Sequence, residues 1–139
     1  MDISAAIAYL RPGITFGPFG IGNCVITSLD GVQTITSWTD ARPQPTQAEI
    51  DDAQLPAFKF TKIAANRAEC ERRIYARYPA GRQSSVALGI YSGAEAEAQA
   101  AIMKDWISDM VAAENAAADA IEAATTVQQV EAVAVTWPA

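Results

Sequence analysis

The chain has 139 residues, of which 50% are hydrophobic and 19% are charged, and its net charge at pH 7 is −6. This composition is too apolar for a disordered chain and too acidic for general affinity for nucleic acid. The length suits one ordinary domain or two very small lobes, and it allows a core without disulfide or metal support.

The cysteine and histidine content limits the kinds of metal site that the chain can form. The two cysteines, Cys24 and Cys70, lie far apart, and histidine is absent, so zinc sites of the usual spacing are excluded. Both thiols are interpreted as small buried hydrophobes. No apolar run approaches the roughly 20 residues of a membrane helix, and the start of the chain lacks the pattern of a signal peptide. We therefore expect a soluble, cytoplasmic protein with no metal and no cofactor.

The first residues predict a short helix. Asp2 or Ser4 is a suitable N-cap, Ile3, Ile7 and Leu10 follow at helical spacing, and the segment 11–13 ends the helix. The glycine-rich stretch from 13 to 22 matches no phosphate-binding motif. Its glycines are interpreted as bends between short strands.

The segment NCVITSLDGVQTITSW predicts a β-hairpin. Polar and apolar residues alternate on both sides of Asp30-Gly31, the dipeptide preferred in a two-residue type I′ turn. Because two strands alone are marginally stable, either residues near 14–19 add a third strand or another part of the chain covers one face.

Residues 43–59 are interpreted as a linker and a short helix. Pro43 and Pro45 hold the chain extended, and Thr46 with Glu49 forms a capping box at the start of the helix. Leu55-Pro56 is expected to end this helix.

From residue 60 to 78 the apolar period becomes helical, and one stripe contains Phe60, Ile63, Arg67, Cys70, Ile74 and Tyr78. Arg67 is either a buried interface anchor or, as we favour, a snorkelling side chain on a partly wet seam. The arginines from 67 to 82 either bind an acidic partner surface or form a solvated face of the helix, and we favour the second interpretation. Residues 82–93 then form a short helical turn or loop.

Residues 94–124 predict the longest element, an amphipathic helix of about 45 Å at about 1.5 Å per residue. Its apolar half contains Ile102, Met103, Trp106, Ile107, Met110, Val111 and Ile121. Its alanine-rich second half lets another helix approach closely. We expect self-association here, and the alternative is an ordinary antiparallel helix pair inside one subunit.

The last residues predict a second capped turn, in which Thr125 or Thr126 acts with Gln128 or Gln129. Trp137 is then expected to dock the tail on the helical region or on a neighbouring subunit. The candidate self-association residues are Trp106, Met110, Ala113, Ala117 and Trp137.

A set of short motifs spans most of the chain. They are Ile35 to Trp38, Pro43 to Ile50, Arg72 to Gln83, Trp106-Ile107, Ala120 to Val133 and Trp137-Pro138. In this order, and with the opening AIAYLRPG, the chain resembles small proteins encoded next to tail-fibre genes of tailed bacteriophages. Some of these act as tail-fibre assembly chaperones, and others are uncharacterised or associate with the fibre in the virion.

The resemblance implies a function without catalytic residues. The implied partner is a trimeric tail fibre, bound by a matching trimer of this chain in the host cytoplasm during phage assembly. A structural component of the virion tail, at the fibre or the baseplate, is the alternative. An enzyme is the rival of a different class, but the chain has no histidine to act as a base and no pair of carboxylates predicted to converge.

The sequence therefore predicts an α+β fold with three parts. Residues 1–42 form a small antiparallel β region with a short leading helix, residues 43–59 form the linker and short helix, and residues 60–139 form a helical region. A slowly folding fibre exposes unpaired strand edges, and a sheet edge and an apolar surface of this chain would shield them. The candidate residues for that contact are Ile14, Phe16, Phe19, Ile21, Val25 and Arg67.

Overall fold

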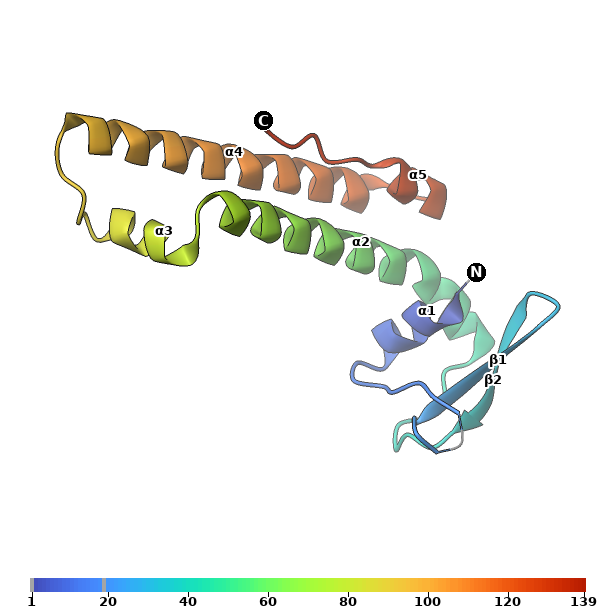
Figure 1. Cartoon of the computed structure of the whole chain (residues 1–139). Coiled ribbons are helices and arrows are strands. Elements are labelled where there is room, and N and C mark those ends of the chain that lie inside the picture. The colour runs from blue at the N-terminus through green and yellow to red at the C-terminus, as the bar shows by residue number, and fades with distance from the viewer. Residues whose placement is uncertain (1, 19) are drawn as a thin grey trace. The chain divides into compact units, whose positions relative to one another are not determined.

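The computed structural model describes residues 2–18 and 20–139 and has an α+β fold (Figure 1). A short helix and two antiparallel strands precede a mostly helical C-terminal region, so the predicted fold class is confirmed. Contacts divide the chain into two compact units, Met1–Thr61 and Lys62–Ala139, called here the N-terminal and C-terminal units. The predicted boundary after residue 59 lies close to this division.

The leading helix, α1, covers Ile3–Leu10, as the sequence predicts. Asp2 is the N-cap, and its Oδ1 accepts a hydrogen bond from the backbone N–H of Ser4 at 2.9 Å. This bond satisfies one of the N–H groups that a helix start leaves unpaired.

The predicted hairpin consists of β1 (Cys24–Leu29) and β2 (Val32–Trp38). Asp30 and Gly31 form the two-residue turn with φ angles of 51° and 79°. Positive φ at both positions is what a type I′ turn requires. Leu29 therefore pairs directly with Val32 across the turn.

A β-bulge in the hairpin shifts the register between Val25 and Ile26. Val25 pairs with Ser37, Ile26 pairs with Ile35, and Thr36 is the extra residue. The bulge places Trp38 opposite Cys24, and both side chains pack in the hydrophobic core.

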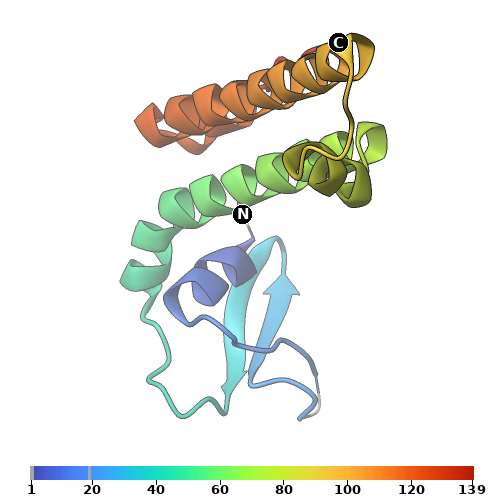
Figure 2. The same ribbon diagram turned by 90° about the vertical axis from the view of Figure 1, so that its left-hand side faces the viewer.

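One hydrophobic cluster holds the N-terminal unit together. Its buried members are Ile3, Ala6, Ile7, Ile14, Cys24, Ile50, Ala53 and Ala57, and Leu10, Ile26, Ile35 and Trp38 pack against them. These residues come from α1, the hairpin and the start of α2, and Figure 2 shows α1 lying against the hairpin. Helices thus cover one face of the two strands, which is one of the two ways of supporting the hairpin that the sequence allows.

The segment before the hairpin adds a single bridge to the sheet rather than a third strand. Phe16 pairs in parallel with Cys24, and the N–H of Gly17 donates to the Cys24 carbonyl at 3.2 Å. Gly22 returns so closely to this segment that a Cβ on it would lie 2.5 Å from the carbonyl carbon of Phe16. The described part of residues 14–19 therefore pairs with β1 only at the start of that strand.

The helix α2 (Gln47–Arg77) begins with the predicted capping box. The N–H of Thr46 donates to Oε2 of Glu49 at 2.7 Å, and the N–H of Glu49 donates to Oγ1 of Thr46 at 3.2 Å. The two bonds fix the start of the helix directly after the proline-rich linker.

The expectation that Leu55-Pro56 ends this helix is wrong, because Pro56 lies inside α2, which is 31 residues long and ends at Arg77. Pro56 is exposed, whereas Ala53 and Ala57 are buried in the core. The carbonyl that loses its helical partner belongs to Asp52, which is also exposed, so this carbonyl is not buried without a partner.

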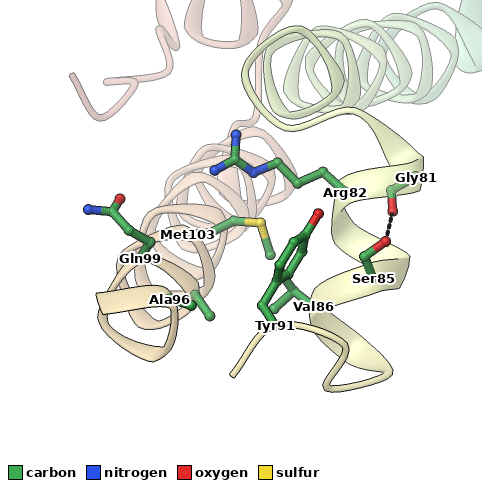
Figure 3. Close-up of a pocket in the computed structure, with 9 residues that line it drawn as sticks. Gly81, Arg82, Ser85, Val86, Tyr91, Ala96, Gln99 and Met103 are labelled. Carbon is green, nitrogen blue, oxygen red and sulfur yellow. Dashed lines mark hydrogen bonds between the residues drawn. The ribbon is translucent and has the colours of Figure 1, made fainter. Parts of the chain in front are cut away.

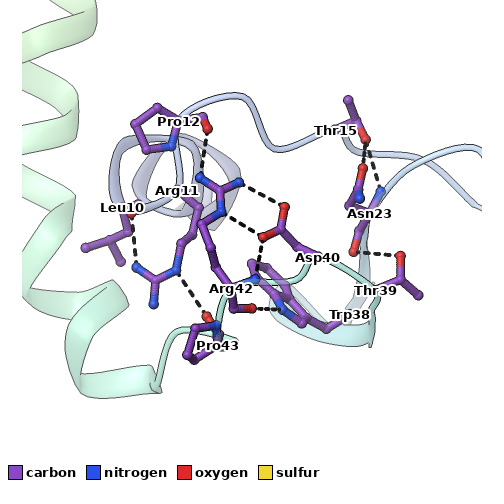
Figure 4. Close-up of polar contacts among 10 residues, drawn as sticks. All are labelled: Leu10, Arg11, Pro12, Thr15, Asn23, Trp38, Thr39, Asp40, Arg42 and Pro43. Atoms are coloured by element: carbon purple, nitrogen blue, oxygen red, sulfur yellow. Dashed lines mark hydrogen bonds and ion pairs between the residues drawn. The ribbon is translucent and has the colours of Figure 1, made fainter.

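Two arginines tie the end of α1 to the segment that follows β2 (Figure 4). Arg42 holds Asp40 through Nε–Oδ1 at 2.7 Å and Nη2–Oδ2 at 2.9 Å, and its Nη1 donates to the Pro12 carbonyl at 2.9 Å. Arg11 donates from Nε to the Pro43 carbonyl at 3.0 Å. The hydrogen bonds from Arg42 lower the pKa of Asp40 to about 2.

In the C-terminal unit, the second part of α2 and α4 (Ala94–Ala123) lie side by side (Figures 1 and 2). Cys70 and Ile74 of α2 pack with Met110 of α4. The short helix α3 (Ala80–Ala87) precedes α4, which begins at the predicted position after Gly93. At 30 residues α4 is shorter than α2, so the expectation that it is the longest element is wrong.

Three side chains that the sequence places on buried stripes are largely exposed. Phe60 is 66% exposed, Ile102 51% and Val111 42%. Phe60 lies in the N-terminal unit, where its ring meets Tyr9 edge-on with the ring centroids 6.2 Å apart. A helix that packs on one neighbour buries only a narrow stripe, so residues at the margins of its apolar half stay in contact with water.

The predicted second capped turn is α5 (Val127–Ala132). Oγ1 of Thr126 accepts from the N–H of Gln129 at 3.2 Å, while Oε1 of Gln129 accepts from the N–H of Thr125 at 2.7 Å. Val130 is fully buried and anchors this turn.

The Asp40–Arg42 pair predicts a loss of stability in acid. A carboxyl whose pKa falls from 3.8 to about 2 on folding stabilises the folded state above pH 4, and this contribution is lost as the pH falls towards 2. We expect the unfolding free energy of Asp40→Asn to change less over this range than that of the unmodified chain, in urea titrations at each pH. Equal pH dependence of the two proteins would contradict the pairing.

Candidate protein-binding surface

Three of the residues predicted to contact a partner are accessible in the N-terminal unit. Phe16 and Ile21 are 40% and 80% exposed, and Val25 is half-buried. Ile14 is a core residue at 9% exposure, so its assignment as a contact residue is wrong. Phe19 lies outside the described residues.

The outer face of the hairpin, opposite the core, carries apolar side chains that the sequence reasoning missed. The cross-strand partners Leu29 and Val32 are 76% and 63% exposed. Thr27 and Thr34 form the next exposed pair, and Val25 follows on the same face because side chains alternate along a strand. Counting outward from the Asp30-Gly31 turn would have identified this uncharged face.

A hollow of about 480 Å³ lies along the free edge of β1, with the segment after Phe16 at one end and the start of α1 beside it. Its lining residues are Asp2, Ser4, Phe16, Gly17, Pro18, Val25, Ile26, Thr27 and Gln33. Phe16 and Val25, two of the predicted contact residues, meet here. Oε1 of Gln33 accepts from the N–H of Ile3 at 2.8 Å and so fixes the start of α1 beside the strands.

The charged side chain at this hollow is acidic. Asp2 is the charged residue among those that line it, and hydrogen bonds from Ser4 lower its pKa, so its carboxylate is ionised at neutral pH. A neutral or basic segment is therefore electrostatically favoured here over an acidic one.

The arginines in the second part of α2 contact acidic residues of the chain itself. Arg72 and Arg73 lie 2.7 Å and 2.6 Å from the carboxylate of Glu69, and these bonds lower the pKa of Glu69 to about 2. Nε of Arg67 lies 3.6 Å from Oε1 of Glu114, and its side chain is 69% exposed. This agrees with the snorkelling interpretation of Arg67 and not with a buried anchor.

The residues predicted for self-association pack inside the C-terminal unit. Met110 is fully buried, Ala117 is 6% exposed and Ala113 is half-buried. Trp106 and Trp137 pack against the cluster that contains Met110. The helix pair within one subunit buries Met110 and Ala117, whereas Trp106, Ala113 and Trp137 stay partly accessible.

The tail docks on the helical region of the same chain. The guanidinium of Arg73 lies 5.2 Å from the ring centre of Trp137. The carbonyl of Ala139 accepts hydrogen bonds from Nε1 of Trp106 at 2.9 Å and from Nη1 of Arg77 at 3.1 Å. Aromatic, cationic and backbone groups thus hold the last residues against α2 and α4.

Polar atoms are buried in the C-terminal unit, on α2 and on α4. Nδ2 of Asn66 and Oε1 of Glu114 have no hydrogen-bond partner among the described residues. Cys70 donates from its thiol to the Met110 carbonyl at 3.7 Å, and burial raises the pKa of that thiol, with a further rise from the Glu114 charge. A buried thiol with a raised pKa is a poor nucleophile.

A second hollow, of about 380 Å³, lies between α3 and α4 (Figure 3). Met103, which is 5% exposed, lies among Val86 and Ala96, and Arg82 and Tyr91 supply polar groups. Its lining residues include no carboxylate and no cysteine.

Within residues 2–18 and 20–139, no three acidic or cysteine side chains are grouped so that they could hold a metal ion. None of the helices in this part of the chain has the length and apolar character needed to span a bilayer. Comparisons with protein-family models, with curated proteins and with solved structures gave no match to the chain.

Replacing Trp137 tests the docking of the tail. We expect Trp137→Ala to lower the unfolding free energy by about 1–3 kcal/mol, less than for a fully buried tryptophan, because the ring is half-buried. Urea unfolding followed by circular dichroism measures this change, with the exposed neighbour Thr136→Ala as the control. Equal stability of the two variants would mean that the tail is a loose end.

Replacing Glu114 tests whether the buried carboxylate stabilises the chain. Because its Oε1 has no hydrogen-bond partner, we expect Glu114→Leu to leave the unfolding free energy unchanged or to raise it by about 1–2 kcal/mol. The same urea titration gives the value. A loss of more than about 1 kcal/mol would show instead that the pair with Arg67 stabilises the fold.

Proposed function

We propose that the chain is a tail-fibre assembly chaperone of a tailed bacteriophage. In this proposal it binds the distal part of a trimeric fibre in the host cytoplasm and assists folding and trimerisation of the fibre. The order of motifs that resembles proteins encoded beside tail-fibre genes supports the phage context. The observation that carries the binding role is the uncharged outer face of the hairpin, where Leu29 and Val32 are 76% and 63% exposed.

Exposed apolar side chains on a sheet are unfavourable for an isolated protein. Covering them yields about 25 cal/mol per Å² of apolar surface. The outer face also lies beside an unpaired strand edge, and natural proteins usually protect such edges with charges or prolines. β1 and β2 contain neither a charged residue nor a proline, which favours an interface over a solvated surface.

A fibre is a suitable partner for such a surface. Intertwined β-fibres fold through contacts between residues far apart in the sequence. Their strands therefore stay unpaired until three chains have assembled. A partner that offers a sheet edge and an apolar face protects those strands from aggregation. The C-terminal unit, with its docked tail, would remain folded throughout.

We also propose a trimer of this chain that matches the fibre, with a contact surface between copies other than the one predicted on α4. Met110 and Ala117 are buried, whereas Leu88, Ile90 and Tyr91 after α3 are 76%, 64% and 51% exposed. Contact between copies would therefore use these three side chains.

Coexpression with the tail-fibre protein encoded beside this chain tests the proposal. We expect the fibre to form soluble trimers only when the chain is present. The double variant Leu29→Glu/Val32→Glu should lower the yield of soluble trimer about tenfold, since two charges would be desolvated at the interface. Val111→Glu, which adds a charge on an exposed apolar residue of α4, is the matched control and should leave the yield unchanged.

Two results would contradict the chaperone. One is a fibre that is equally soluble and trimeric without the chain. The other is the presence of the chain in purified phage particles in fixed ratio to the fibre, which would favour the structural virion component.

A further inference from the structure

We infer that the partner binds as an added β-strand on the outer edge of β1, at Ile26 and Ser28. This inference rests on the proposed function, because it names how the fibre would be held. It concerns the backbone of the strand and the hollow beside it, and does not depend on the side chains of Leu29 and Val32.

The register determines which backbone groups are free. The Cys24 N–H donates to the Thr15 carbonyl at 3.0 Å, and the Cys24 carbonyl accepts from Gly17 at 3.2 Å, so the backbone of Cys24 points away from β2. Alternate residues of a strand point the same way, and Ile26 and Ser28 therefore also direct their N–H and C=O groups outward.

The segment from Thr15 to Gly17 occupies this edge only at its beginning. The side chains of Thr15 and Asn23 hold the segment there, and the Asn23 N–H donates to Oγ1 of Thr15 at 3.0 Å (Figure 4). The chain then turns away, and the hollow of about 480 Å³ takes its place beside Val25, Ile26 and Thr27. An incoming strand would extend pairing that the chain itself has begun.

The chemistry of the hollow identifies the occupant as an extended segment of the fibre that is neutral or basic. Its apolar side chains would pack on Phe16 and Val25, and a lysine or arginine would pair with Asp2. A second copy of this chain suits the edge less well, because pairing two β1 edges would bring two Asp2 carboxylates to one sheet in a chain of net charge −6.

Ser28→Pro tests the inference directly. Proline removes the outward N–H and blocks the edge, while the hairpin keeps its own ladder because that N–H does not face β2. We expect Ser28→Pro to bind the fibre at least about tenfold more weakly in a titration with purified fibre, whereas Ser28→Ala, which keeps the N–H, should bind within about twofold. Circular dichroism establishes whether both variants are folded.

Asp2→Asn provides a second measurement that does not depend on tolerance of proline. Asparagine retains the N-cap of α1 and removes the charge, so fibre binding should weaken several-fold and depend less on salt. Unchanged affinity and salt dependence in this variant would overturn the inference.

The remaining outcomes separate the inference from the proposed function. If the unmodified chain and folded Ser28→Pro bind the fibre equally, the added strand is wrong and the chaperone stands. If the unmodified chain does not bind the fibre, both are wrong. A free chain that dimerises in light scattering, and that Ser28→Pro makes monomeric, would show that a second copy occupies the edge.

Discussion

The two-residue turn at Asp30-Gly31 is the constraint on which the proposed binding surface depends. With φ angles of 51° and 79° it pairs Leu29 with Val32, and this pairing sets the register of the hairpin. A shift by one residue would move every side chain to the opposite face. The turn therefore decides at once that Ile26 lies towards the core, that the outer face is apolar and uncharged, and which backbone groups remain at the free edge.

Features that depend on neighbouring residues were predictable from the sequence. Short motifs predict the hairpin turn, the capping box at Thr46, the capped turn at Thr126 and the start of α4 after Gly93, and the structure contains all of them. The continuation of α2 through Pro56 was not predictable from neighbouring residues. Other parts of the chain bury Ala53 and Ala57, and this burial outweighs the loss of one exposed hydrogen bond.

The candidate surface was predictable only in part, for a related reason. Composition and periodicity show which residues are apolar, but exposure depends on what the rest of the chain covers. Ile14 joins the core while Ile21 does not, although both lie in the same glycine-rich stretch. Met110 and Trp137 serve the chain's own helix pair, where the sequence alone allowed a second copy as the partner. Counting from the Asp30-Gly31 turn was sufficient to find Leu29 and Val32, whereas the free edge follows from the hydrogen bonds of Cys24 in the structure.

Residue-resolved amide hydrogen exchange tests the central claim, that β1 presents an open edge to the partner, most directly. In the free chain, the amides of Ile26 and Ser28 should exchange fast while those of Thr27 and Leu29, which face β2, exchange slowly. In the complex with the fibre, Ile26 and Ser28 should become as protected as their neighbours. Slow exchange at all four amides in the free chain, or unchanged exchange at Ile26 and Ser28 in the complex, would contradict the account.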